Sequence, residues 1–150
     1  MHVFASPDDF KAAVGEDIGS SDWFHITQER VDTFADATED RQWIHVDPDR
    51  AKDGPFGATI AHGYLTLSLL VPLMKGVFRV DGQRMGLNYG LNKVRFPAPV
   101  KVGSQVRAAV TVKSVEDVEG GVQVVWLVTV TAEGSTKPGC VAESITRYYY

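Results

Sequence analysis

The sequence predicts an α+β fold in which an antiparallel sheet wraps around one long apolar helix. Residues 60–75 are apolar on nearly all sides of a helix, which indicates a helix that is buried all round. From residue 84 onward the chain changes to strand-like runs rich in β-branched and aromatic residues. Helices followed by a meander of strands are typical of this class. Because the 150 residues contain no linker or repeat, we expect one domain spanning residues 1–150.

Short elements are expected before the long helix. Ser6 and Pro7 are typical of a helix start, and that helix should end at Gly15. Residues 22–26 are predicted to form a strand. Thr27 then begins a capping box in outline, although its Glu sits one residue early, and Val31, Phe34 and Ala35 share one face of the helix that follows.

The long helix has a predicted start, an irregularity and an end. Asp47 should cap a brief helical turn over residues 48–51, and residues 54–57 are loop material. The helix should then run from Ile60 to Lys75 and stop at Gly76. Because proline has no amide N–H, Pro72 should kink or thin its last turn.

Four long strands are predicted in the second half of the chain. In the clearest of them, one face consists of Val122, Val124, Trp126, Val128 and Val130. The other face carries Val125 and Leu127, which suggests cover by a further element or a partner subunit. The four runs cover residues 85–96, 104–118, 121–133 and 140–150, with turns at 119–121 and 134–139.

Composition excludes several classes of protein. Hydrophobic residues make up 44% of the chain and charged residues 23%, and the net charge of −4 provides no basic face for nucleic acid. The apolar stretch 65–71 is too short to cross a membrane, and the N-terminus lacks the pattern of a signal peptide. The single Cys140 is expected to pack in a core strand. One unpaired cysteine fits a reducing cytoplasm, which is the expected location.

Asp40 and His45 are the candidate chemical pair. On spacing alone they could be an ordinary helix cap and a loop residue. However, Trp43 and Ile44 are apolar and should carry His45 toward the interior, where an imidazole needs a partner. A carboxylate and an imidazole could hold one water between them, take up its proton as it attacks, and return a proton to the neighbouring carbon.

Gly63 is the candidate for stabilising charge on the substrate. It lies near the start of the apolar helix, where its backbone N–H could donate to a carbonyl oxygen on which negative charge develops. Without a side chain it allows close approach. His62 is ambiguous, and we expect it to pack or to hydrogen-bond within the core.

Three segments carry a specific resemblance. They are residues 34–47 (FADATEDRQWIHVD), 61–68 (AHGYLTLS) and 88–100 (NYGLNKVRFPAPV). They resemble the signature of MaoC-like dehydratases, the R-specific enoyl-CoA hydratases, and within them the nodulation-protein-N-like branch. The resemblance runs from about residue 17 to the C-terminus and implies the hot-dog fold.

The resemblance implies reversible addition of water to a trans-2-enoyl thioester, giving an (R)-3-hydroxyacyl product. It makes Asp40 and His45 the catalytic pair and Gly63 the carbonyl-binding amide, with Ser68 and His62 in support. It implies no metal and no cofactor, and the sequence has no closely spaced His/Cys cluster suited to zinc. The family more often has Gly where this chain has Glu39, whose carboxylate could perturb the pair or point to solvent.

The substrate and the partners follow from the same resemblance. The acyl group would lie along the helix in a tunnel lined by Leu65, Leu69 and Phe96. Lys93 and Arg95 could meet the phosphates of CoA or of a carrier arm, or could be solvated strand residues. The partners would be an acyl-CoA or acyl-carrier substrate and a second copy of the chain in a homodimer.

Two other functions share the fold. One is an acyl thioesterase, against which the Asp40–His45 spacing and the His62–Gly63 pair argue. The other is a non-catalytic acyl-thioester-binding subunit, for which Glu39 is the one local argument.

Overall fold

The computed structural model describes all 150 residues, and its central feature is a six-stranded antiparallel sheet. The strands follow the order β2-β6-β7-β8-β5, and β3 also pairs with β6. A small parallel sheet joins β1 to β4. The strands are β1 (His2–Phe4), β2 (Asp17–Ser20), β3 (Phe24–His25), β4 (Phe78–Val80), β5 (Met85–Arg95), β6 (Gln105–Val118), β7 (Gly121–Ala132) and β8 (Cys140–Tyr149).

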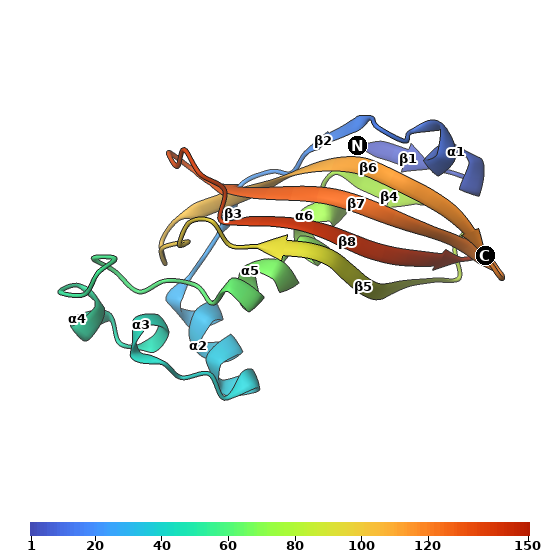
Figure 1. Ribbon diagram of the computed structural model, residues 1–150. Helices are drawn as coiled ribbons and strands as arrows, with labels where there is room; N and C mark the ends of the chain where they lie inside the picture. The colour runs from blue at the N-terminus through green and yellow to red at the C-terminus, as the bar shows by residue number, and fades with distance from the viewer.

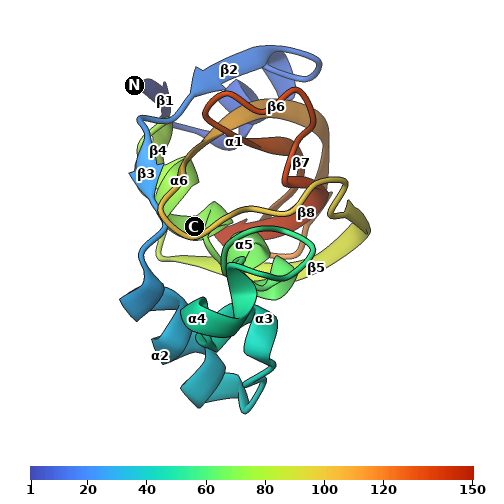
Figure 2. The same ribbon diagram turned by 90° about the vertical axis from the view of Figure 1, so that its left-hand side faces the viewer.

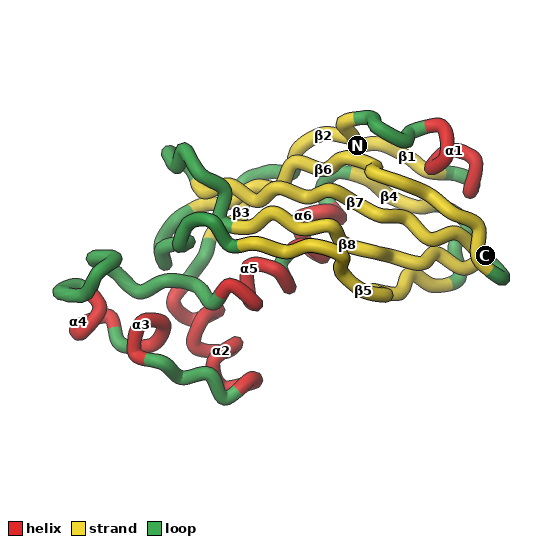
Figure 3. The backbone as a smooth tube through the Cα atoms, in the orientation of Figure 1, coloured by secondary structure: helices red, strands yellow, loops and turns green.

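Six short helices accompany the sheet. They are α1 (Pro7–Ala12), α2 (Gln28–Thr38), α3 (Trp43–Val46), α4 (Pro48–Ala51), α5 (Gly63–Ser68) and α6 (Leu70–Lys75). Figure 2 shows the sheet curving around α5 and α6. Figures 1 and 3 show α2, α3 and α4 gathered at one end of the sheet, opposite the end that holds α1 and the C-terminus. The predicted α+β class, with an antiparallel sheet wrapped around a central helical segment, is confirmed.

The inner face of the sheet forms the core. The five residues Val122, Val124, Trp126, Val128 and Val130 are all at most 1% exposed, as predicted. The Trp126 ring stacks on Phe78 at 4.4 Å and meets Phe4 and Phe10 edge-on at 5.8 and 6.0 Å. The N-terminal segment therefore seals one end of the core. Its strand β1, like β2 and β4, was missed in the sequence because a strand of three or four residues shows too little alternation.

The central helix departs from prediction at two points. It begins at Gly63 rather than Ile60, because Ile60 and Ala61 are extended and Ala61 N donates to Val100 O at 2.8 Å. It is also divided into α5 and α6 at Leu69. Pro72 lacks the amide hydrogen that would bond to the Ser68 carbonyl, which explains the weak point.

The prediction that this helix is buried all round is wrong for one side. Tyr64 is 72% exposed and Val71 is 44% exposed, two turns apart on the same side. Next to them, β5 exposes Leu87, Tyr89 and Leu91 along an edge of the sheet that pairs with no other strand. We call these five residues the α5–β5 face.

The outer face of the sheet is not covered by any helix of the chain (Figure 1). Val125 is buried by its neighbours in the sheet, whereas Leu127 is 37% exposed. The expected cover by a further element of this chain is therefore absent. Cys140 is fully buried at the start of β8, as expected for a core residue, and burial raises the pKa of its thiol to about 11.

The predicted helix starts are confirmed by their caps. Ser6 caps α1 in a capping box with Asp9, and Thr27 Oγ1 accepts from Arg30 N at 3.2 Å. Asp47 accepts from Arg50 N at 3.1 Å. Two bounds were too generous: α1 ends at Ala12 rather than Gly15, and the predicted strand 22–26 is paired only over Phe24–His25. None of the helices combines the length and the apolar character needed to cross a bilayer.

Candidate active site

A cleft of about 470 Å³ opens between the helical end of the molecule and the start of α5. It brings together Asp40, His45, His62 and Gly63, four of the residues that the sequence singled out, with Phe96 from the predicted tunnel. Its full lining is Phe34, Thr38, Asp40, His45, His62, Gly63, Tyr64 and Phe96.

His45 is held with one ring nitrogen directed at the backbone. It lies on the single turn α3 and is 6% exposed. Its Nδ1 is 2.7 Å from the carbonyl oxygen of Ile60, which can only accept, so Nδ1 carries the hydrogen. In the neutral ring Nε2 then holds the free lone pair. Burial is the main cause that lowers the pKa of His45 below its ordinary value of 6.5, which keeps this lone pair available.

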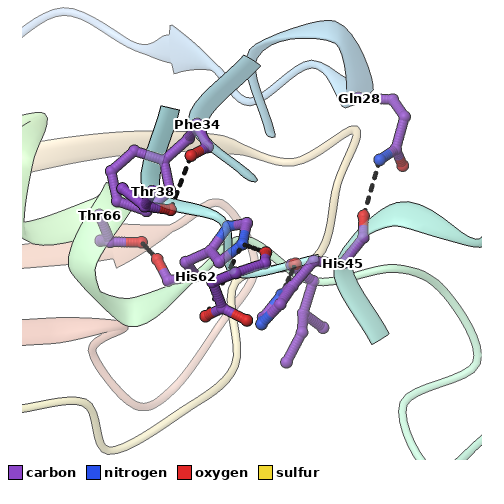
Figure 4. Close-up of polar contacts among 8 residues, drawn as sticks. Gln28, Phe34, Thr38, His45, His62 and Thr66 are labelled. Atoms are coloured by element: carbon purple, nitrogen blue, oxygen red, sulfur yellow. Dashed lines mark hydrogen bonds and ion pairs between the residues drawn. The ribbon is translucent and has the colours of Figure 1, made fainter. Parts of the chain in front are cut away.

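Gln28 fixes the turn that carries His45, a role that no sequence pattern predicted. Its Nε2 donates to the His45 carbonyl at 2.7 Å (Figure 4). Its Oε1 accepts from Thr59 Oγ1 at 2.6 Å. Thr59 is far from Gln28 in sequence, so only the folded chain reveals the pair. Gln28 thereby ties the start of α2 to α3 and to the segment that leads into α5.

Asp40 follows directly after the end of α2. Its side chain is 55% exposed and lines the cleft. The preceding Glu39 has φ 62°, the one positive φ outside glycine. This left-handed residue ends α2 and turns the chain toward the cleft. Glycine adopts that conformation at little cost, whereas a residue with a side chain is strained there.

His62 is buried, at 3% exposure, and contacts both members of the pair. Its Nε2 donates to the backbone carbonyl of Asp40 at 2.8 Å, and it is 4.0 Å from the Asp40 carboxylate. Its ring stacks on His45 with centroids 3.8 Å apart and an interplanar angle of 22°. The expectation that it packs and hydrogen-bonds inside the protein was correct, but its partners are the site residues themselves (Figure 4).

Asp40, His45 and His62 have ligand atoms within 4.8 Å of one another, a spacing at which metal sites occur. The ring orientations oppose such a use. Two imidazoles bind one ion when both lone pairs point at it, roughly 2 Å away and in the plane of each ring. The nearly parallel, stacked rings of His45 and His62 offer no common point of that kind, and His62 Nε2 already donates to Asp40.

Gly63 is the first residue of α5, so its amide N–H has no partner within the helix. A Cβ at this position would lie 2.9 Å from Phe96 Cδ2, too close for a real contact. The aromatic ring therefore occupies the space that a side chain would need. Glycine is required here by packing, while its amide borders the cleft.

Five predicted residues lie outside the cleft. Leu65 and Leu69 are each 5% exposed and belong to the core, and their role as tunnel lining stays a prediction. They point to the opposite side of the helix from Tyr64 and Val71. Ser68 is exposed and donates to Tyr64 O at 2.8 Å. Lys93 and Arg95 are exposed on β5 and do not line the cleft.

A groove continues from Ser68, one turn beyond Tyr64, along the exposed side of the helix. Its two parts, of about 420 and 310 Å³, share Leu70, Val71, Asn88 and Ser144. The helix supplies an apolar wall, and the strands supply Asn88, Ser144 and Thr146. We call it the α6 groove. Neither Leu65 nor Leu69 lines it.

Comparison with known proteins agrees with this geometry. The model of the MaoC like domain matches residues 9–134. The chain belongs to the MaoC-like family. It is 59% identical over 149 residues to 3-hydroxyacyl-thioester dehydratase Z of Mycobacterium tuberculosis, covering 99% of each chain. It is 44% identical over 141 residues to nodulation protein N of Rhizobium leguminosarum bv. viciae, covering 92% of this chain and 88% of that protein.

Solved structures confirm the hot-dog fold. The R-hydratase PhaJ1 from Pseudomonas aeruginosa aligns with a TM-score of 0.72 at 24% identity, over 91% of this chain and 81% of that one. The (R)-hydratase from A. caviae aligns with a TM-score of 0.66 at 22% identity, over 88% and 96%. At these identities the likeness establishes the architecture that holds the cleft.

Proposed function

We propose that this protein is a hydro-lyase that reversibly adds water to a trans-2-enoyl thioester, giving an (R)-3-hydroxyacyl thioester. The observation that carries the proposal is the cleft in which the Asp40 carboxylate, the His45 imidazole and the Gly63 amide meet. The name of the relative that is 59% identical, a 3-hydroxyacyl-thioester dehydratase, supports the same substrate class.

The geometry suggests how the reaction proceeds. A water molecule held between the Asp40 carboxylate and His45 Nε2 forms its new bond to C3 of the substrate as the pair takes up its proton. The electrons of the C2–C3 double bond move toward the thioester oxygen, where the Gly63 N–H stabilises the developing negative charge. The pair then returns a proton to C2. The addition involves no net oxidation or reduction, and the two side chains account for both proton transfers, so we propose that neither a metal nor a cofactor takes part.

We place the acyl chain in the α6 groove, which follows the helix away from the cleft. Phe96 remains beside the reacting carbons, because its ring packs on Gly63. Lys93 and Arg95 stay candidates for the phosphates of CoA or of a carrier arm, since both are exposed cations on β5. Ser68 would act at the entrance of the groove rather than on the reacting atoms.

We propose that two copies of the chain pair through the α5–β5 face. Its five large hydrophobic residues are each more than 40% exposed, and β5 has a free edge. Exposed apolar residues gathered along a free strand edge are typical of an interface. A homodimer would also cover the α6 groove, which runs beneath this face. We also propose a cytoplasmic location, because Cys140 is a free thiol and disulfides are rare in the cytosol.

The decisive test is an assay with crotonyl-CoA that follows both the conjugated enoyl absorbance and free thiol. Hydration removes the absorbance without releasing thiol, whereas a thioesterase releases thiol and a binding subunit changes neither. Asp40→Asn and His45→Gln should each lower the hydration rate at least ~10²-fold. Asp36→Asn and His25→Gln, at two exposed positions, serve as matched controls. A near-normal rate in either site variant would refute the assignment, and loss of activity after dialysis against EDTA would refute the metal-free reaction.

A further inference from the structure

His62 contacts both Asp40 and His45, and its side chain is only 3% exposed. It precedes Gly63 in sequence, it donates to the Asp40 carbonyl at 2.8 Å, and its ring stacks on His45 at 3.8 Å. Phe34 packs against the same ring at 4.9 Å. A nearly fully buried polar side chain with these neighbours joins three segments that are separate in the sequence.

We propose that His62 is a positioning residue that fixes Asp40 and His45 relative to each other and to the Gly63 amide. The inference rests on the proposed hydration. Asp40 lies beyond the end of α2, outside any helix or strand, and half of its side chain is exposed. The hydrogen bond from His62 Nε2 anchors the backbone of Asp40 to the start of α5. The carboxylate is thereby held at a set distance from the amide that receives the substrate carbonyl.

The ring stack restrains the other member of the pair. The bond from His45 Nδ1 to Ile60 O fixes one edge of the imidazole but leaves it free to tilt about that bond. The His62 ring, at an interplanar angle of 22°, closes off one side. Nε2 is therefore directed into the cleft. Because a misplacement of about 1 Å can cost a site on the order of 10²-fold in rate, this restraint matters for catalysis.

A direct catalytic role for His62 does not fit the contacts. Nε2 is occupied by its bond to the Asp40 carbonyl. Nδ1 is buried and has no hydrogen-bond partner in the protein. Neither nitrogen is free to exchange a proton with a molecule in the cleft, so the effect of His62 must pass through Asp40 and His45.

Two substitutions separate its two contacts. His62→Gln can place an amide donor near the position of Nε2 but removes the ring, and His62→Phe keeps a ring but removes the donor. With crotonyl-CoA we expect His62→Phe to lower kcat by about 10²-fold while KM changes little, because the Gly63 amide and the α6 groove are untouched. The kcat of His62→Gln should be at least about tenfold higher than the kcat of His62→Phe.

The pH profile of His62→Gln gives a second readout. His62 and Asp40 are the titratable groups whose charges act on His45, and the charge of His62 lowers the His45 pKa. Removing His62 should therefore move the acidic limb of kcat/KM toward higher pH. Loss of fold stability alone would not move this limb.

A double-mutant comparison identifies the route of the effect. If His62 acts through Asp40, His62→Phe should cost much less in the Asp40→Asn background than in the wild-type protein. If His62→Phe does not fold, His62→Asn replaces it in the same comparison. A normal kcat in a folded His62→Phe variant, or fully additive losses, would overturn the positioning role. A wild-type protein that fails to hydrate crotonyl-CoA would instead overturn the proposed function.

Discussion

Glu39 carries the clearest local strain in the chain. Its φ of 62° lies in the left-handed region, which costs a residue with a side chain roughly 1–2 kcal/mol. Glycine would avoid this cost but would gain freedom in the unfolded chain, which offsets part of the benefit. The side chain is exposed, so its charge is well solvated. The departure from the family pattern thus concerns the backbone at the end of α2 more than the chemistry of Asp40.

We therefore expect Glu39→Gly to stabilise the protein by about 0.5–1 kcal/mol, a rise of roughly 1–4 °C in Tm for a chain of this size. The hydration rate should stay within about twofold, because no site atom moves. Thermal unfolding followed by circular dichroism measures the first quantity. Glu29→Gly, in the first turn of α2, is the control and should lower Tm. A lower Tm for Glu39→Gly would contradict this account.

The burial of His45 predicts a pH dependence. The neutral imidazole is the form that takes up a proton, so hydration is lost as pH falls through the His45 pKa. Burial lowers this pKa below 6.5, with the His45–Ile60 bond acting in the opposite direction. The acidic limb of kcat/KM should therefore have its midpoint below pH 6.5. A midpoint at or above that value, with the fold intact by circular dichroism, would show that His45 is not the group that titrates.

At the scale of elements, α5, α6 and the strands beside them form a groove with two unlike walls. Leu70, Val71 and Met74 make the helical wall apolar. The inner face of β8 begins with the buried Cys140 and Ala142 but continues with Ser144 and Thr146. These two polar residues lie at inward positions and line the groove, so we expect them to weaken its binding of a long apolar acyl chain.

We expect Ser144→Val together with Thr146→Val to improve use of long acyl chains. Replacing two hydroxyl groups with methyl groups, and adding one further methyl at position 144, should raise kcat/KM for trans-2-decenoyl-CoA by about fivefold or more, with little change for crotonyl-CoA, whose chain ends near the cleft. The ratio of the two kcat/KM values is the measurement. Thr129→Val, on the outer face of the sheet, is the matched control. An unchanged ratio would refute the proposal that the acyl chain lies in the α6 groove.

At the scale of the whole molecule, two surfaces could bind a second copy. The α5–β5 face exposes five large hydrophobic residues along the free edge of β5, one of which, Leu87, lies opposite Arg147 on the outer side of the sheet, whereas the middle of the outer face exposes Leu127. The outer face also carries an ion pair between Lys113 and Glu143. The larger number of exposed hydrophobic residues favours the α5–β5 face as the interface between two copies, and this face borders the α6 groove.

Light scattering after gel filtration tests this choice. The wild-type chain should elute as a dimer, and Val71→Lys with Leu91→Lys should give a monomer, because two charges would be buried without partners. Leu127→Lys is the control with similar exposure on the other face. A dimer that survives the first change but not the second would move the interface to the outer face.

The sequence by itself determined the features that depend on near neighbours. Caps at Ser6, Thr27 and Asp47 were predictable because a cap bonds to an amide within three residues. The four long strands were predictable from their composition and alternation. The candidate pair Asp40 and His45 was predictable from the apolar residues Trp43 and Ile44 beside His45 and from the family resemblance, all within one short segment.

Only the tertiary structure decided what depends on distant partners. Short strands such as β1 and β4 exist because each supplies the other's hydrogen bonds. Leu65 and Leu69 share a helix with Val71, and only the position of the sheet determines which side is the core. Gln28 and His62 acquire their roles from Thr59 and Asp40, more than twenty residues away. Contacts of this kind leave no periodic pattern in a single sequence, because only folding brings the two groups together.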